Sequence, residues 1–232
     1  MKLPKLYKGK LIKRYKRFLA EVYLQDLNQT IIAHCPNSGS MMTLNEENLE
    51  VYVSKNTNPL NKLAYKLELV KNKNNVLVGI NTSITNKIVL DGLENQLFSE
   101  FKEFTNIKPE ATFNKSRFDF YLTNKQEKIF LEVKNVSLVR QNLLAEFPDC
   151  KTTRGEKHLQ DLILAKQHNF RCISLYIIQR EDANKFSIAK DLDAKYYSTI
   201  TQAKIFGVEL LCYNCIVNTN EIKINKNIPI VI

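Results

Sequence analysis

Residues 116–136, Ser-Arg-Phe-Asp-Phe-Tyr-Leu-Thr-Asn-Lys-Gln-Glu-Lys-Ile-Phe-Leu-Glu-Val-Lys-Asn-Val, contain the pattern that decides the fold of the second half of the chain. Apolar and polar residues alternate in two runs within this stretch, 118–122 and 129–136, and the alternation predicts two strands. Because strand side chains point to opposite faces in turn, Asp119 lies on the less apolar face of the first strand. Glu132 likewise lies opposite its apolar neighbours in the second strand. The stretch therefore predicts a hairpin with one acidic residue on each strand.

The register of this hairpin decides whether the two acids meet. A turn centred between Lys125 and Gln126 pairs residues that are equally far from it, and Asp119 and Glu132 are such a pair. Directly opposed residues have Cβ atoms about 5 Å apart. Lys134 is two residues beyond Glu132 and shares its face. A slip of one residue would separate the acids, so the prediction depends on register.

Two carboxylates at this separation repel each other unless a proton or a cation lies between them. Oxygen ligands favour hard cations, so Asp119 and Glu132 predict a site for Mg²⁺ or Mn²⁺. Lys134 beside them would orient an attacking water or stabilise charge that develops on a phosphoryl group. The three residues are the predicted catalytic group of a phosphodiesterase. The alternative is a surface ion-pair ladder of either acid with Lys134.

The elements around the hairpin favour the catalytic interpretation. An apolar stripe at helical spacing predicts a helix over residues 85–104. The expected order continues with strands at 109–113, 118–122 and 129–136, a loop at 137–152, a helix at 153–169, a strand at 172–178, a helix at 194–206 and a strand at 208–216. This α-β-β-β-α-β-α-β order predicts a mixed sheet with packed helices. It is the order of the PD-(D/E)XK nuclease core, which carries its acids on the second and third strands.

The first eighty residues predict a different architecture. Short strand-like runs separated by turn residues are expected at 18–24, 30–34, 51–54, 63–70 and 76–80. Five short strands in this length predict a small barrel of the OB type, which binds nucleic acids across one face. The chain is therefore expected to be an α+β, mixed protein with an OB-like nucleic-acid-binding domain at 1–82 and a nuclease-like domain at 83–232. The linker is expected at about 81–86.

The charge of the chain predicts a polyanionic partner. The 232 residues carry a formal net charge of +10, although the abundance of Lys, Asn and Ile also fits the coding bias of an AT-rich genome. The chain has seven arginines against twenty-seven lysines. Arginine is informative here because its planar fork grips phosphate. The predicted contacts to DNA, or to RNA, are Arg14, Lys16, Arg17, Arg117, Arg154 and Lys157, and the alternative for each is a solvated surface.

Composition also limits the cellular setting. No apolar run approaches the length of a membrane span, and residues 1–17 are basic without the apolar core of a signal peptide. We therefore expect a cytoplasmic protein without membrane contact. The five cysteines are irregularly spaced, and Cys212 and Cys215 form a single C-x-x-C motif. This pair is either a metal or redox site or two small core residues at the end of a strand.

Segments along nearly the whole chain resemble the sugar fermentation stimulation protein A (SfsA) family. They are Arg14–Val22, His34–Met41, Val78–Thr82, Ser116–Phe120, Glu132–Val136, Phe147–Asp149, Arg154–Leu159 and Gly207–Glu209. The resemblance implies an OB-like domain, a nuclease-like domain, DNA binding and a link to the regulation of sugar use. It also implies that Asp119, Glu132 and Lys134 occupy the motif positions.

One further acid is expected from the preceding helix. Asp91, Glu94 and Glu100 are the candidates, and a helical wheel favours Glu94. The resemblance implies Asp91 as a metal ligand, although Asp91 is one methylene shorter than the family's usual glutamate.

Two hypotheses of function follow. The first is a divalent-metal-dependent nuclease that acts on DNA or RNA. The second is a non-catalytic DNA-binding regulator linked to sugar metabolism. A third possibility is a ligand sensor that uses residues 34–41, a segment whose Pro, Asn and Gly residues are equally typical of a turn.

Overall fold

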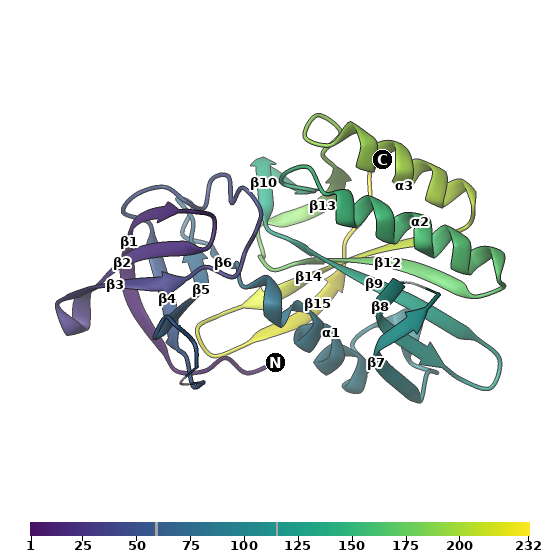
Figure 1. The fold of residues 1–232 in the computed structure, drawn as a ribbon, viewed down its shortest axis with the longest axis horizontal. Helices are drawn as coiled ribbons and strands as arrows, with labels where there is room; N and C mark the ends of the chain where they lie inside the picture. The colour runs from purple at the N-terminus through teal and green to yellow at the C-terminus, as the bar shows by residue number, and fades with distance from the viewer. Residues whose placement is uncertain (59, 115) are drawn as a thin grey trace.

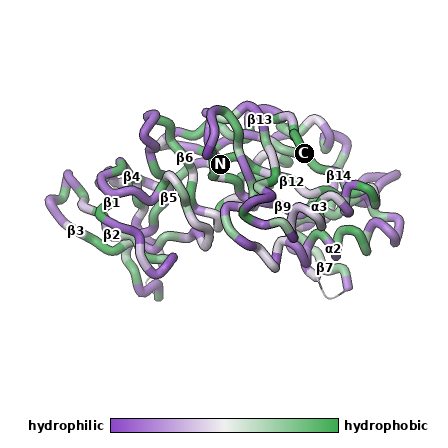
Figure 2. Tube along the Cα trace, turned by 90° about the horizontal axis from the view of Figure 1, so that it is seen from above, coloured by the Kyte–Doolittle hydropathy of each residue, from purple (hydrophilic) through white to green (hydrophobic). Residues whose placement is uncertain are grey.

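A computed structural model describes residues 1–58, 60–114 and 116–232. A β-barrel at one end and a larger α/β domain at the other lie side by side (Figure 1). Hydrophilic residues are concentrated in the outer turns of both parts (Figure 2). This architecture confirms the predicted fold class.

The barrel is a six-stranded sheet with the order β3-β2-β1-β4-β5-β6, and a parallel pairing of β3 with β5 closes five of these strands. The strands are β1 (Leu6–Tyr15), β2 (Leu19–Leu24), β3 (Gln29–His34), β4 (Glu50–Lys55), β5 (Tyr65–Lys71) and β6 (Leu77–Gly79). The strand β1 is additional to the predicted set. Its side chains carry little apolar signal because Gly9 and Leu11 are its fully buried residues.

The α/β domain is built on a mixed six-stranded sheet with the order β15-β14-β12-β9-β8-β7. Its strands are β7 (Asn106–Phe113), β8 (Ser116–Thr123), β9 (Lys128–Val136), β12 (Arg171–Ile178), β14 (Glu209–Val217) and β15 (Ile222–Asn227). The helix α1 (Thr85–Glu94) packs on one face, and α2 (Thr153–Gln167) and α3 (Ala194–Ile205) pack on the other (Figure 1). The predicted hairpin register is confirmed, because Phe120 pairs with Leu131 and Tyr121 with Phe130.

The predicted helix over 85–104 is too long. Helix α1 ends at Glu94, Gln96 has a positive φ of 55°, and a 3-10 turn follows at Ser99–Phe101. Gly92 leaves room for the ring of Phe98 to pack against α1, because a Cβ atom at position 92 would approach that ring to 2.7 Å. Phe101 and Phe104, the aromatic residues at the end of the predicted helix, are still buried in the core. They reach it from the 3-10 turn and the residues after it.

The predicted loop over 137–152 is also corrected. It contains β10 (Leu138–Gln141) and β11 (Leu143–Phe147), which form a three-stranded sheet with β13 (Ala183–Ile188). This hairpin is hard to predict from the sequence because it contains polar residues such as Arg140 and Glu146. In the fold, the side chains of these two residues pair with each other across the hairpin. The extra sheet places residues 146–152 close to Asp119 on β8 and to Glu132 and Lys134 on β9.

Candidate functional site between the two domains

A cavity of about 460 Å³ lies between the barrel and the α/β domain. Its floor contains Asp119 on β8 and Glu132 and Lys134 on β9. The sequence predicted that these three residues share a face, and the structure brings them together. The walls come from both domains and include Arg17, Asn37, Ser38, Gly39, Thr82, Ser83, Asn86, Glu146, Asp149, Lys151, Thr152, Arg154 and His158.

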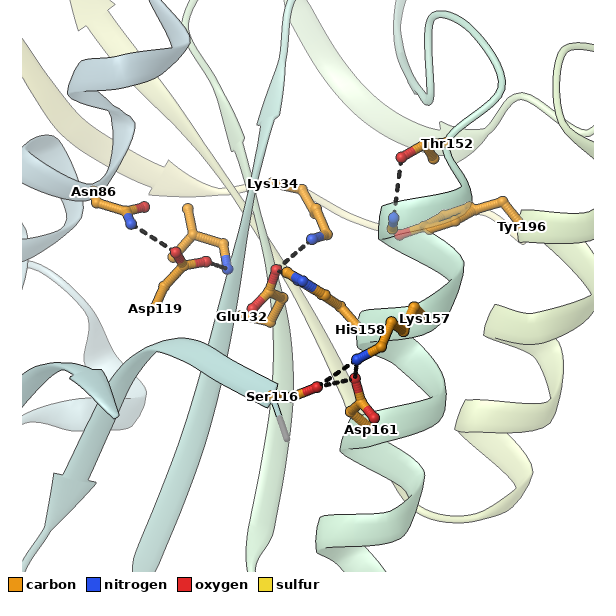
Figure 3. Close-up of polar contacts among 12 residues, drawn as sticks. Asn86, Ser116, Asp119, Glu132, Lys134, Thr152, Lys157, His158, Asp161 and Tyr196 are labelled. Atoms are coloured by element: carbon orange, nitrogen blue, oxygen red, sulfur yellow. Dashed lines mark hydrogen bonds and ion pairs between the residues drawn. The ribbon is translucent and has the colours of Figure 1, made fainter. Parts of the chain in front are cut away.

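Asp119 is held by hydrogen bonds to both of its carboxylate oxygens. The backbone N–H of Val133 donates to Oδ2 at 2.8 Å, and Asn86 Nδ2 donates to Oδ1 at 2.7 Å (Figure 3). Burial and the nearby charge of Glu132 raise the pKa of Asp119 above its ordinary value, in spite of these donors and of Lys134. The ionised form of Asp119 is therefore penalised in this site and would be relieved by a cation.

Glu132 has an asymmetric environment. Its Oε1 atom accepts a hydrogen bond from Lys134 Nζ at 2.5 Å and contacts His158 Nδ1 (Figure 3). Its Oε2 atom is buried and has no hydrogen-bond partner among the described residues. Burial opposes ionisation of Glu132, but Lys134 and His158 outweigh it and hold its pKa below the ordinary value. Glu132 is thus an ionised carboxylate with one free oxygen.

His158 is a site residue that the sequence interpretation missed. It lies on α2, one turn after Arg154, so both side chains reach the cavity from the same helix face. The spacing of four residues between Arg154 and His158 was the signal in the sequence that could have identified His158 as a site residue. Asn86 is a second site residue that was not predicted, and the structure shows that it orients Asp119.

The helix acid is corrected by the structure. Asp91 pairs with the N-terminal ammonium of Met1 at 2.8 Å and does not line the cavity. Glu94 is exposed and is also absent from the cavity wall. Residue 86, five positions before Asp91 on α1, lies beside Asp119, and it is an asparagine. The predicted metal ligand Asp91 therefore belongs to an ion pair with the chain terminus.

Arg14 was predicted to contact phosphate, and the structure gives it another role. Its guanidinium donates to the backbone carbonyls of Arg17, Asn37, Gly39 and Ser40 at 2.8–3.1 Å. These bonds fix the 37–40 segment against the β1–β2 turn. The segment is therefore a structured turn, and three of its residues form part of the cavity wall.

The other predicted nucleic-acid contacts separate into two groups. Arg17 and Arg154 are exposed and line the cavity. Lys157 donates to Ser116 and Asp161, as Figure 3 shows below Glu132. Arg117 forms an exposed ion pair of 3.4 Å with Glu110, and Lys16 is exposed in the β1–β2 turn. Lys16, Arg117 and Lys157 therefore do not line the cavity.

Cys212 and Cys215 are fully buried within β14. Burial raises the pKa of both thiols and disfavours the thiolate that zinc binding or redox chemistry requires. The structure favours the interpretation that they are core residues.

Comparisons with known proteins agree with this architecture. Residues 12–80 match the family model described as the SfsA N-terminal OB domain, and residues 83–221 match the sugar fermentation stimulation protein RE domain. The chain belongs to the sugar fermentation stimulation protein family. The family's homolog from Pelagibacter ubique is 49% identical over 97% of each chain, and the homolog from Geobacter metallireducens is 39% identical over 100% of each chain.

A solved structure has the same fold. The structure of Pyrococcus furiosus SfsA in complex with Ca²⁺ has a TM-score of 0.90 at 23% identity and covers 100% of this chain and 98% of that chain. Among the described residues of the present SfsA family member, no helix is long and apolar enough to cross a membrane.

Proposed function

We propose that this SfsA family member binds DNA, or RNA, along the interdomain cavity and hydrolyses phosphodiester bonds with a divalent cation held by Asp119 and Glu132. The observation that carries the proposal is the free, buried Oε2 atom of Glu132 beside a second carboxylate. Leaving a buried charged oxygen without a partner is costly unless a ligand completes it. The Ca²⁺ complex of the Pyrococcus furiosus relative supports a divalent cation in this fold.

The donor set fits a cation that is only partly held by protein. No group of three His, Cys, Asp or Glu side chains in the described part of the chain forms a ready metal centre. Mg²⁺ is usually bound by one or two carboxylates together with waters and substrate phosphates. A bound divalent cation would polarise a phosphoryl oxygen and lower the pKa of a coordinated water. Asp119 and Glu132 are the residues that would hold it.

The remaining residues would bind and orient the substrate. Lys134 Nζ lies at the Glu132 carboxylate, where a positive charge stabilises negative charge on a phosphoryl group. Arg17 and Arg154 stand on opposite domains and would grip flanking phosphates from two sides. Hydrogen bonds from Asn86 and from the Val133 amide hold the Asp119 carboxylate in place beside Glu132. The barrel thus completes a binding surface that the α/β domain provides in part.

The experiment is a time course of the purified wild type and of Lys134→Ala on single- and double-stranded DNA and on RNA, with Mg²⁺, Mn²⁺ or chelator. We expect metal-dependent cleavage by the wild type and a loss of about 10²–10³-fold in Lys134→Ala, with nucleic-acid binding retained. Lys223→Ala is the control, since Lys223 is exposed on β15. Cleavage that resists chelator, or that Lys134→Ala matches, would contradict the proposal.

A second candidate is a DNA-binding regulator without turnover. The observation in its favour is that an amide, Asn86, stands beside Asp119 where an acid was expected, and that one Glu132 oxygen is already occupied by Lys134 and His158. This candidate predicts salt-sensitive DNA binding, no metal-dependent cleavage by the wild type, and a small loss of affinity in Lys134→Ala.

A further inference from the structure

The barrel carries a second cavity next to the interdomain one. It has a volume of about 390 Å³ and is lined by His34, Pro36, Asn56, Asn61, Lys62, Leu63, Lys66 and Ser83. Ser83 lines both cavities. Thr82 donates from its N–H and from Oγ1 to the Pro36 carbonyl at 3.1 and 2.8 Å, so the wall between the cavities is fixed by hydrogen bonds. We call this second hollow the barrel cavity.

Two side chains of the barrel cavity are set by the strand pairing that closes the barrel. β3 and β5 pair in parallel, with His34 opposite Lys66. Their neighbours Ala33 and Leu67 are buried in the barrel core, so His34 and Lys66 point outward together. Within the described residues neither Lys66 nor Lys62 forms an ion pair, so both charges are available to an anionic ligand.

An aromatic side chain lies beside this cavity. Phe18 is 45% exposed, although it packs against the His34 ring with a centroid separation of 6.5 Å and an interplanar angle of 32°. Phe18 directly follows Arg17, which lines the interdomain cavity. The β1–β2 turn therefore presents a cation toward one cavity and an exposed ring beside the other.

We infer that Phe18, His34, Lys62 and Lys66 form a binding site for an unpaired base and its phosphates, and that the chain therefore selects single-stranded nucleic acid. Aromatic rings beside cationic side chains are the arrangement with which proteins bind single strands, because every unpaired base offers a face for stacking. The strand would run from the barrel cavity past Phe18 and Arg17 into the interdomain cavity. This inference rests on the proposed nucleic-acid binding and names its substrate class.

A duplex does not satisfy these features. Its bases are paired and stacked on both sides, so none offers a free face to Phe18 unless it is first unpaired and flipped out of the stack, which costs free energy. A frayed end or a single strand incurs no such cost. The site is therefore expected to separate the two substrates by affinity, independently of any cleavage.

The test is fluorescence anisotropy of the full chain with a labelled oligothymidylate and with a duplex of the same length, in chelator so that nothing is cleaved. We expect tighter binding of the single strand. Phe18→Ala should weaken that binding by roughly tenfold, and Phe18→Tyr should retain it. Phe206→Ala is the matched control, because Phe206 is 51% exposed at the far end of α3.

Two further measurements keep the test independent of folding defects in Phe18→Ala. The wild type should bind an abasic strand as weakly as Phe18→Ala binds oligothymidylate. The double variant Lys62→Ala/Lys66→Ala should reduce the slope of log affinity against log salt by about 1.4, which is two single-strand phosphate contacts, whereas Lys223→Ala/Lys226→Ala should not.

The outcomes separate this inference from the proposed function. Equal affinity for single strand and duplex, or equal effects of Phe18→Ala and Phe206→Ala, would overturn the inference and leave nucleic-acid binding intact. No binding of either substrate at low salt would overturn both.

Discussion

Glu132 and Glu146 are both buried carboxylates that line the interdomain cavity, with 2% and 6% of their surfaces exposed. Arg140 binds both oxygens of Glu146, through Nε at 2.8 Å and Nη2 at 2.6 Å. Both partners of Glu132 share one oxygen, and the other oxygen has none among the described residues. A bidentate arginine completes a structural carboxylate. A carboxylate that is incompletely paired, as Glu132 is, can still bind an added cation. Within one cavity, this difference separates the structural residue Glu146 from the site residue Glu132.

The largest expected difference between the two glutamates is in catalysis. Glu132→Gln removes a negative charge that the proposed cation needs, so cleavage should fall by about 10²–10³-fold. Glu146→Gln leaves Asp119 and Glu132 unchanged and should retain most of its activity per folded molecule. Initial rates at saturating Mg²⁺, normalised to the folded fraction, measure this. Equal losses in the two variants would remove the distinction.

Stability should show the opposite order. Glu146→Gln removes the buried charge that pairs with Arg140, and this loss should cost about 1–3 kcal/mol of unfolding free energy. Arg140 also pairs with Asp191, which is largely exposed, so Asp191→Asn is the matched control with a much smaller effect. Urea denaturation of both variants measures the difference. A loss in Glu146→Gln no greater than in Asp191→Asn would show that the buried arm contributes little.

Cation binding gives a third contrast. Mg²⁺ or Mn²⁺ that binds the folded state alone should stabilise the wild type by about 2.7 kcal/mol at a hundredfold excess over its dissociation constant. The shift in melting temperature should disappear in Asp119→Asn and persist in Glu146→Gln. A shift that persists in the double variant Asp119→Asn/Glu132→Gln would place the cation elsewhere.

The sequence predicted the parts of this site that depend on strand periodicity. The alternation of apolar and polar residues and the turn centred between Lys125 and Gln126 predicted that Asp119, Glu132 and Lys134 share a face. The pairing of β8 with β9 has the predicted register. The helix contribution was not predictable in the same way. A wheel assigns faces but does not show that α1 ends at Glu94 or that the Met1 ammonium captures Asp91.

The role of Arg14 was missed for a related reason. A basic residue near a turn is equally compatible with phosphate binding and with capping of backbone carbonyls. The choice between them depends on the path of residues 37–40, which comes from tertiary contacts. One such contact is the approach of Asp149 to Gly39, where a Cβ atom would lie 2.2 Å from the carboxylate.

The smallest expected effect is the pH dependence of stability without metal, and its sign differs between the two site acids. Burial and the charge of Glu132 raise the pKa of Asp119 in the folded state, so the folded chain holds that proton more tightly than the unfolded chain. The stability advantage of wild type over Asp119→Asn should therefore fall as pH rises from the ordinary aspartate range through the raised pKa.

For Glu132 the direction is reversed. Lys134 and His158 outweigh burial and lower its folded-state pKa, so its ionised form stabilises the fold above the ordinary glutamate range. That contribution should be lost as pH falls through the lowered pKa, and the advantage of wild type over Glu132→Gln should grow with rising pH. Urea unfolding across the acidic range, in chelator, measures both differences. Two slopes of the same sign would contradict the difference between the two acids, in which cationic neighbours lower the pKa of Glu132 while burial and the charge of Glu132 raise the pKa of Asp119.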